Sequence, residues 1–241
     1  MCRLLAFNTK ERVDTDVIRA FVDAARNDVY FRYVSHSHGW GIAAIVEKEG
    51  KQRIIYYKSV EPIYEDDMFY NIVESLKGNR IIGIVHARKA GKEFLIGLRH
   101  NHPYHLKIRS HDLYFAHNGS INRKAFEHPD YPSTDSYLFF LELVKNVENS
   151  PISIEKAYSK LILELGRYSS SLNSALLTFN EVEGPEVYFA HYYNKERIKE
   201  IEEYYRVYRY GDYVFSSTIA YYLGKKVESV ELGSVIRLSN D

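Results

Sequence analysis

The chain has 241 residues, 45% of them hydrophobic, which is enough to bury the core of one large domain. Its 32 basic and 32 acidic residues give no net formal charge, so the composition argues against a nucleic-acid partner. One cysteine excludes an internal disulfide and is typical of a reducing compartment. Because no apolar run is long enough to span a membrane and no signal-peptide pattern is present, we expect a cytoplasmic protein without a membrane partner.

The single cysteine, Cys2, directly follows the initiator Met1. Methionine aminopeptidases cut before small residues, so the mature chain is expected to begin with this cysteine. An N-terminal cysteine carries a thiol and an α-amine with pKa values near ~8.5 and ~8, and the amine can act as the base for its own thiol. The apolar residues 4–7 predict a buried strand that holds the terminus in place. A cysteine at position 2 can also be incidental, so the remaining motifs have to decide.

The first half of the chain alternates strands and helices. Spacing and capping residues predict a helix after Asp14 or Thr15, strands over 40–46 and 53–58, a helix over 68–76 that Gly78 and Asn79 stop, and a buried strand over 81–85.

The second half begins with a long polar loop from Lys89 to Ser110, a kind of segment that is usually functional. A strand follows over 113–116, then helices that begin at 133–135 and over 152–167. The rest is expected to be mostly strand, over 175–180, 187–193, 213–216 and 234–238. No repeat or linker divides the chain, so we expect a single domain over 1–241 with central strands covered by helices.

Polar side chains occur where predicted strands end. His86 and Arg88 follow an apolar strand, where a guanidinium favours an anionic ligand, although it can also simply reach solvent. Asn118 and Gly119 follow the next strand and predict either a turn or an oxyanion hole. Thr134-Asp135-Ser136 predicts first a helix cap and second a ligand for an ammonium group.

Taken in chain order, these motifs resemble the glutaminase domain of class II glutamine amidotransferases, which are N-terminal-nucleophile hydrolases. The resemblance covers essentially the whole chain and is closest in length to the stand-alone members. It implies an α+β fold, a four-layer αββα sandwich. The motifs are Cys2, Gly39-Trp40-Gly41, His86-Ala87-Arg88, Asn101-His102-Pro103-Tyr104, His117-Asn118-Gly119, Thr134-Asp135-Ser136, Val214-Phe215-Ser216-Ser217 and Gly233-Ser234-Val235-Ile236.

The resemblance assigns a role to each matching residue. Cys2 corresponds to the nucleophile, and Asn118 with Gly119 to the oxyanion hole. Arg88 corresponds to the arginine that pairs with the α-carboxylate of glutamine, and Asp135 to the carboxylate that binds its α-amine. His86 and Trp40, from the same motifs, are assigned to substrate binding.

Three departures put the substrate in doubt. Gly91 stands where the family often has a threonine that contacts the substrate, Asn101 directly precedes His102 where the family has a spacer residue, and Tyr137 replaces a frequent acidic residue. The expected activity is release of ammonia from the side-chain amide of glutamine through a Cys2 thioester. A first alternative is hydrolysis of a γ-glutamyl amide in a larger metabolite.

Two further alternatives lie outside this chemistry. Retention of Met1 would leave a non-catalytic binding or regulatory subunit, with the abundant tyrosines as an interface. Many of those tyrosines, such as Tyr204, Tyr205, Tyr208 and Tyr210, are instead expected on strands and sheet edges. Histidines of two loops could bind a metal, although they lack a compact zinc motif: His36, His38, His100, His102, His105 and His111. We expect neither a metal nor another cofactor. No phosphate-binding loop is present, so either a separate synthase subunit accepts the ammonia or the protein simply hydrolyses its substrate.

Overall fold

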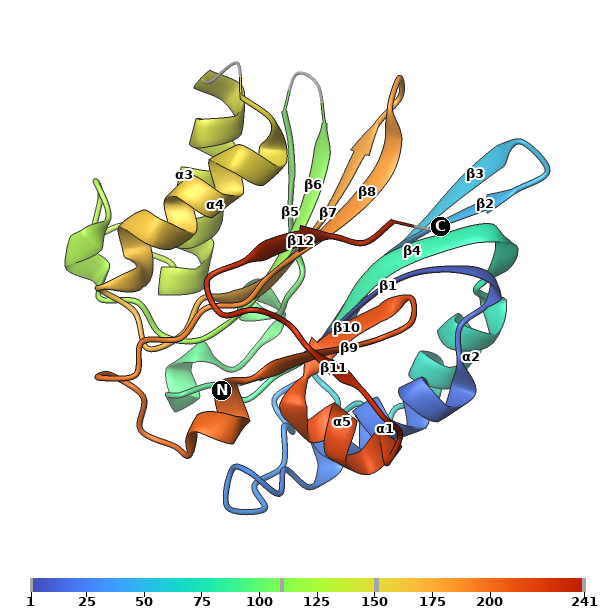
Figure 1. Ribbon diagram of the computed structural model, residues 1–241, viewed down its shortest axis with the longest axis horizontal. Helices are drawn as coiled ribbons and strands as arrows, with labels where there is room; N and C mark the ends of the chain where they lie inside the picture. Colours follow the sequence, from blue (N-terminus) through green and yellow to red (C-terminus); the bar gives the residue numbers. More distant parts are fainter. Residues whose placement is uncertain (1, 109–110, 150–151, 240–241) are drawn as a thin grey trace.

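The computed structural model describes residues 2–108, 111–149 and 152–239 (Figure 1). Met1, whose removal is expected, and the end of the predicted loop at Ser110 lie outside these ranges. The described α-helices are α1 (Thr15–Arg26), α2 (Asp67–Ser75), α3 (Asp135–Asn149), α4 (Ile154–Gly166) and α5 (Ser217–Leu223). Short 3-10 helices are η1 (Glu93–Leu95), η2 (Leu98–His100), η3 (Arg123–Ala125) and η4 (Glu202–Tyr205). Within these ranges no helix combines the length and apolar character that crossing a membrane requires.

The strands form two antiparallel sheets. The first has the order β11-β9-β10-β1-β4-β2-β3, and the second has the order β12-β8-β7-β6-β5. The strands of the first sheet are β1 (Arg3–Arg12), β2 (Trp40–Lys48), β3 (Lys51–Ser59), β4 (Lys77–Ala87), β9 (Val207–Tyr210), β10 (Tyr213–Ser216) and β11 (Glu228–Ser229). Those of the second are β5 (Tyr104–Lys107), β6 (Asp112–Asn118), β7 (Asn173–Asn180), β8 (Gly184–Ala190) and β12 (Val235–Arg237).

The sheets and helices form four layers, as Figure 1 shows. Helices α1, α2 and α5 pack on the outer face of the first sheet, and α3 and α4 pack on the outer face of the second. A third apolar cluster fills the space between the two sheets, with side chains from β1, β2, β4, β6, β7 and β8. The predicted arrangement of central strands with covering helices is therefore present.

The strand β1 lies in the middle of the first sheet, between β4 and β10. Its side chains alternate: Leu4 and Ala6 enter the layer between the sheets, and Leu5 and Phe7 pack under the helices. All four are fully buried, so β1 anchors the N-terminus as the apolar run predicts.

Three details differ from the sequence prediction. Helix α2 ends at Ser75, and Gly78 and Asn79 already belong to β4, where a Cβ on Gly78 would lie 2.6 Å from the Glu47 carbonyl oxygen. The predicted loop from Lys89 contains β5, a four-residue strand that pairs with β6. Helix α5 occupies part of the C-terminal region expected to be mostly strand. Such short elements are decided by their pairing partners, which local sequence does not show.

The tyrosines expected on strands fall into two groups. Tyr208 and Tyr210 lie on β9, as expected. Tyr204 and Tyr205 belong to η4 and are almost completely buried, so for these two the expectation was wrong.

Candidate active site

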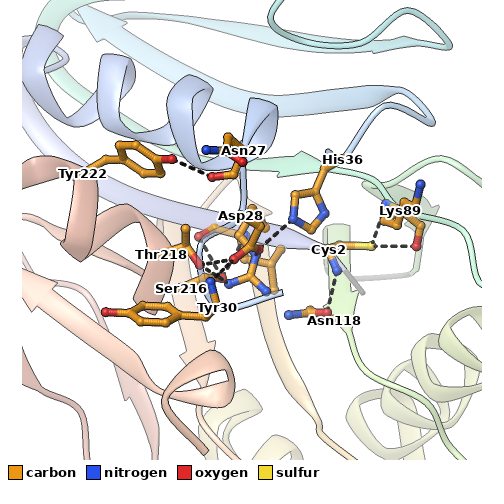
Figure 2. Close-up of polar contacts among 12 residues, drawn as sticks. Cys2, Asn27, Asp28, Tyr30, His36, Lys89, Asn118, Ser216, Thr218 and Tyr222 are labelled. Atoms are coloured by element: carbon orange, nitrogen blue, oxygen red, sulfur yellow. Dashed lines mark hydrogen bonds and ion pairs between the residues drawn. The ribbon is translucent and has the colours of Figure 1, made fainter. Parts of the chain in front are cut away.

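Cys2 lies immediately before β1 and is buried, with 8% of its surface exposed. Its backbone nitrogen donates a hydrogen bond of 2.7 Å to Oδ1 of Asn118, at the end of β6 (Figure 2). The Lys89 N–H donates to the Cys2 sulfur at 3.4 Å, and the Lys89 carbonyl oxygen lies 3.7 Å from it. Two residues from distant parts of the chain, Asn118 and Lys89, thus hold the nitrogen and the sulfur of Cys2.

The electrostatic surroundings of Cys2 favour the thiolate. Burial alone would raise the pKa of the thiol, but the neighbouring His86 and Arg88 act in the opposite direction, and the pKa falls to about 6. At neutral pH the sulfur is therefore largely ionised, and the thiolate is the nucleophilic form of cysteine.

The imidazole rings of His86 and His102 lie next to each other beside Cys2. His86 is fully buried at the end of β4, and its ring centroid lies 4.3 Å from that of His102. The His102 ring in turn lies 4.4 Å from that of Tyr104. Burial lowers the pKa of His102 well below its usual value, so this ring is neutral. Among the described residues, no ring nitrogen of His86 or His102 has a hydrogen-bond partner.

Arg88 is buried, with 5% exposure, and lies directly after β4. Its backbone is fixed, because its N–H donates to the Gly39 carbonyl oxygen and its own carbonyl oxygen accepts from the His38 N–H. Its guanidinium forms no ion pair with any described carboxylate, and Nη1 is buried without a hydrogen-bond partner. A buried cation with an unused donor is costly unless an anion binds there.

The segment from His117 to Gly119 crosses from β6 to the loop beside Cys2. Nε2 of His117 donates to the Ser171 carbonyl oxygen at 3.1 Å, so Nδ1 is the acceptor for the Ser136 hydroxyl at 2.9 Å. Gly119 has no room for a side chain, because a Cβ there would lie 2.0 Å from the same carbonyl oxygen. The backbone next to Asn118 is therefore held closely against Ser171, in the segment that leads into β7.

Asp135 is half-buried at the first turn of α3. Its Oδ2 accepts a hydrogen bond of 2.8 Å from the Ile121 N–H, and its Oδ1 accepts one of 2.9 Å from the Ser136 N–H. The carboxylate is thus attached to the segment that follows Gly119. The helix cap itself is Thr134, whose Oγ1 accepts from the Tyr137 N–H.

Tyr104 lies among the predicted site residues. Its hydroxyl shares a hydrogen bond of 2.8 Å with Oγ1 of Thr134. Burial raises the pKa of Tyr104 to about 12, and the charges of Arg88, Asp135 and Cys2 each influence that pKa. The structure therefore brings together Cys2, His86, Arg88, Asn118, Gly119 and Asp135.

Trp40 does not lie with these residues. Its indole is fully buried on the helix-covered side of the first sheet, 5.1 Å from both Tyr57 and Phe69 between ring centroids. Its Nε1 donates to Asp66 at 2.9 Å. Successive residues of β2 face opposite sides of the sheet, which turns Trp40 away from the layer that contains His86. We correct the assignment of Trp40 from substrate binding to the core.

Gly39, the glycine before Trp40, explains why the Gly39-Trp40-Gly41 motif lies near the site although the Trp40 side chain does not. A Cβ on Gly39 would lie 2.2 Å from the Asn101 side-chain nitrogen and 2.4 Å from the Ser59 carbonyl oxygen, and its φ is +99°. Nδ2 of Asn101 donates to that carbonyl oxygen at 2.7 Å. Gly39 therefore lets the Asn101 segment, with His102 behind it, pack against β2.

Three of the histidines considered for metal binding have other hydrogen-bond partners. His36 bonds to Asp28 at 2.8 Å, His38 accepts from the Ala90 N–H at 3.0 Å, and His105 bonds to Asp112 at 2.8 Å. Within the described residues, no group of three or more His, Cys, Asp and Glu side chains could hold a metal ion.

A buried ion network lies behind the nucleophile and has no counterpart in the sequence analysis. Nε of Arg3 lies 3.0 Å from Oδ2 of Asp28, and both side chains are completely buried. Asp28 also bonds to His36 and to the Thr218 hydroxyl, as Figure 2 shows. The Arg3 guanidinium lies 4.0 Å from the ring centre of Tyr204. The one available signal was an arginine at the start of an apolar strand.

Three kinds of similarity bear on this geometry. The family model described as "Glutamine amidotransferases class-II" matches residues 1–192. An uncharacterised protein of Methanocaldococcus jannaschii is 30% identical over 165 residues, which are 65% of this chain and 41% of the relative. The chain thus spans less than half the length of that curated relative.

Two solved structures are similar in fold. The structure of the allosteric regulatory enzyme of purine biosynthesis matches with a TM-score of 0.55 and 18% identity, over 98% of this chain and 46% of that one. A glutamine aminotransferase class-II domain protein of Silicibacter pomeroyi matches with a TM-score of 0.50 and 15% identity, over 99% and 95% of the two chains.

The fold is therefore α+β, with two antiparallel sheets flanked by helices, as in class II amidotransferases of the N-terminal-nucleophile type. The family match covers more than half of the chain and includes Cys2, Arg88, Asn118, Gly119 and Asp135. The chain belongs to the class II glutamine amidotransferases.

Proposed function

We propose that the protein hydrolyses the side-chain amide of glutamine through a thioester on Cys2. The observation that carries this proposal is the 2.7 Å hydrogen bond from the Cys2 nitrogen to Oδ1 of Asn118. Because this bond uses the oxygen end of the Asn118 amide, the Nδ2 end remains as a hydrogen-bond donor. Nδ2 forms no hydrogen bond with any described residue.

The chemistry follows from these groups. After removal of Met1, the Cys2 α-amine holds the proton that the thiol has given up, and the thiolate attacks the amide carbon of the substrate. The oxyanion accepts hydrogen bonds from Nδ2 of Asn118 and the Gly119 N–H. The C–N bond breaks, the amine returns the proton to the leaving nitrogen, and ammonia departs. Water then cleaves the thioester, which releases glutamate and the free thiol.

The binding groups match the ends of the glutamine molecule. The unpaired Arg88 guanidinium suits the α-carboxylate, and the Asp135 carboxylate suits the α-ammonium group. His86 lines the space next to the sulfur and lowers the pKa of Cys2.

The first test is substitution of the nucleophile. The Cys2→Ala variant is expected to release no ammonia from glutamine while its thermal unfolding is unchanged, because the side chain is small and forms few contacts. Mass spectrometry of the active protein is expected to show loss of Met1. Ammonia release by Cys2→Ala, or full activity of a protein that retains Met1, would contradict the proposal; retained Met1 without activity would favour a binding or regulatory subunit.

The second test concerns the oxyanion. Asn118→Ala is expected to lower kcat by about 10²–10³-fold, with a smaller change in KM, because the donor acts mainly in the transition state. Steady-state ammonia release measures both constants. An unchanged kcat would assign the Asn118 amide to structure alone.

A further inference from the structure

A large cavity borders the candidate active site. It has a volume of about 630 Å³, within the range of about 300–1,000 Å³ that is common for small-molecule sites. Its wall includes Ser120, which directly follows the oxyanion residue Gly119, and Ile121, whose N–H binds Asp135. Gly91 lines it as well, two residues after Lys89, whose backbone contacts the Cys2 sulfur.

Gly91 is exposed at this border and leaves it unobstructed. A Cβ built on Gly91 would meet no atom within 4 Å, so the glycine is not required by packing. In a compact protein, space beside a site that is not filled by side chains is available to a ligand.

Another part of the cavity wall carries positive charge. Arg197 and Lys199 line the cavity and are exposed, and neither forms an ion pair with a described carboxylate. The acidic group on this wall, Glu200, lies 3.9 Å from Arg32, which offsets its charge. The hydroxyls of Ser120 and Ser170 share a hydrogen bond of 2.9 Å at the wall and can also bind a polar ligand.

We propose that this cavity holds the amine part of a γ-glutamyl amide, and that this amine part carries an anionic group. The inference rests on the proposed function. If Arg88 and Asp135 bind the α-carboxylate and the α-amine, both charged ends of the glutamyl group are occupied. A larger substrate can then extend only from its amide nitrogen. The unpaired Arg197 and Lys199 select a carboxylate, sulfonate or phosphate on that extension.

The reaction is the one already described, with a different leaving group. The Cys2 sulfur bonds to the γ-carbonyl carbon, the C–N bond breaks, and a primary amine that bears the anionic group leaves in place of ammonia. Water then releases glutamate, so no further reactant is needed.

The experiment compares kcat/KM for glutamine, γ-glutamyl-ethylamide and γ-glutamyl-glutamate, which differ in the charge of the amine part. We expect γ-glutamyl-glutamate to be the best of the three. The double variant Arg197→Gln/Lys199→Gln is expected to lower its kcat/KM by about tenfold and to leave glutamine unchanged, because exposed charges act through partly screened interactions. Added salt is expected to weaken this preference in the unmodified protein.

Lys195→Gln is the matched control, since Lys195 is an exposed lysine of the same segment, does not line the cavity and pairs with Glu202 at 3.4 Å. Equal hydrolysis of the neutral and anionic amides, or an equal effect of the double variant on all substrates, would overturn the inference. Hydrolysis of glutamine without hydrolysis of either amide would overturn the inference alone. Absence of hydrolysis of all three substrates would overturn the proposed function as well.

Discussion

Two buried arginines lie close to Cys2 and differ in one respect. Arg3 is 0% exposed and its guanidinium is paired with Asp28, bonded to the Thr218 hydroxyl at 3.1 Å and stacked over Tyr204. Arg88 is 5% exposed and has no such carboxylate among the described residues. Since a buried cation needs a counter-ion, Arg3 has an internal one and Arg88 requires one from outside. The difference separates a cation that the fold itself neutralises from one that remains available to an anionic ligand.

The largest expected effect is on Arg3. Arg3→Met removes one partner of a buried ion pair and leaves the Asp28 carboxylate without its counter-ion, so the free energy of unfolding is expected to fall by about 3–5 kcal/mol. Urea denaturation measures this loss.

A double-mutant cycle provides the control for Arg3. Arg3→Met/Asp28→Leu removes both charges and is expected to recover part of the lost stability, because the uncompensated carboxylate is gone. If the two single losses simply add in the double variant, Arg3 and Asp28 do not stabilise each other.

The next effect is on Arg88, where we expect a loss of activity and not a loss of stability. Arg88→Met is expected to lower kcat/KM for glutamine by about 10²-fold, the loss of a charge-assisted contact of about 1.5–3 kcal/mol. Its free energy of unfolding is expected to stay the same or to rise, because a buried unpaired charge has been removed. Kinetics and urea denaturation of one preparation test both. A stability loss like that of Arg3→Met would mean that the two arginines are not different in kind.

The last effect, small over any one pH unit, is the pH dependence of the network around Arg3 and Asp28. Burial lowers the pKa of His36 from 6.5 to about 3, so the unfolded chain takes up this proton first as pH falls. Stability is therefore expected to decline from about pH 6.5 downward, by at most about 1.4 kcal/mol per pH unit. Burial would raise the pKa of Asp28, but Arg3 and His36 lower it from 3.8 to about 2, which adds a second loss below about pH 4.

His36→Asn tests the origin of this decline. An amide can still donate to Asp28 but does not titrate, so the loss of stability between pH 6.5 and 4 is expected to become smaller while the loss below pH 4 remains. Urea denaturation across this pH range provides the measurement. An unchanged pH profile would place the decline elsewhere in the protein.

The sequence predicted where the residues around Arg88 lie relative to the strands. Cys2, His86, Arg88 and Asn118 lie next to apolar strands, and strand periodicity is a local property that the sequence displays. The sequence prediction failed for Trp40, because a motif does not show which face of a sheet a side chain occupies. To assign that face, one would have to know which side of the sheet another residue of β2 occupies and count along the strand from there.

The contacts of Arg3 with Asp28 and Thr218 were not predictable in the same way. Asp28 lies in the irregular segment after α1, and Thr218 begins the short helix α5, so no local pattern connects either of them with Arg3. The cavity beside Gly91 also depends on segments far apart in the chain, from Phe31 to Tyr205. Such contacts arise from tertiary packing and have no period in the sequence.

The adjacency of Cys2 and Arg3 has a consequence for how accurately the nucleophile is held. Arg3 lies opposite Ala87 and Leu4 opposite His86 in the first sheet. A slip of β1 by one residue would exchange its two faces, so that the thiol would point under the helices and the guanidinium would enter the layer between the sheets. Asp28 can pair with Arg3 in only one of these alignments. A cation on the helix-covered side of the sheet therefore determines which side chain of the N-terminus faces the layer between the sheets.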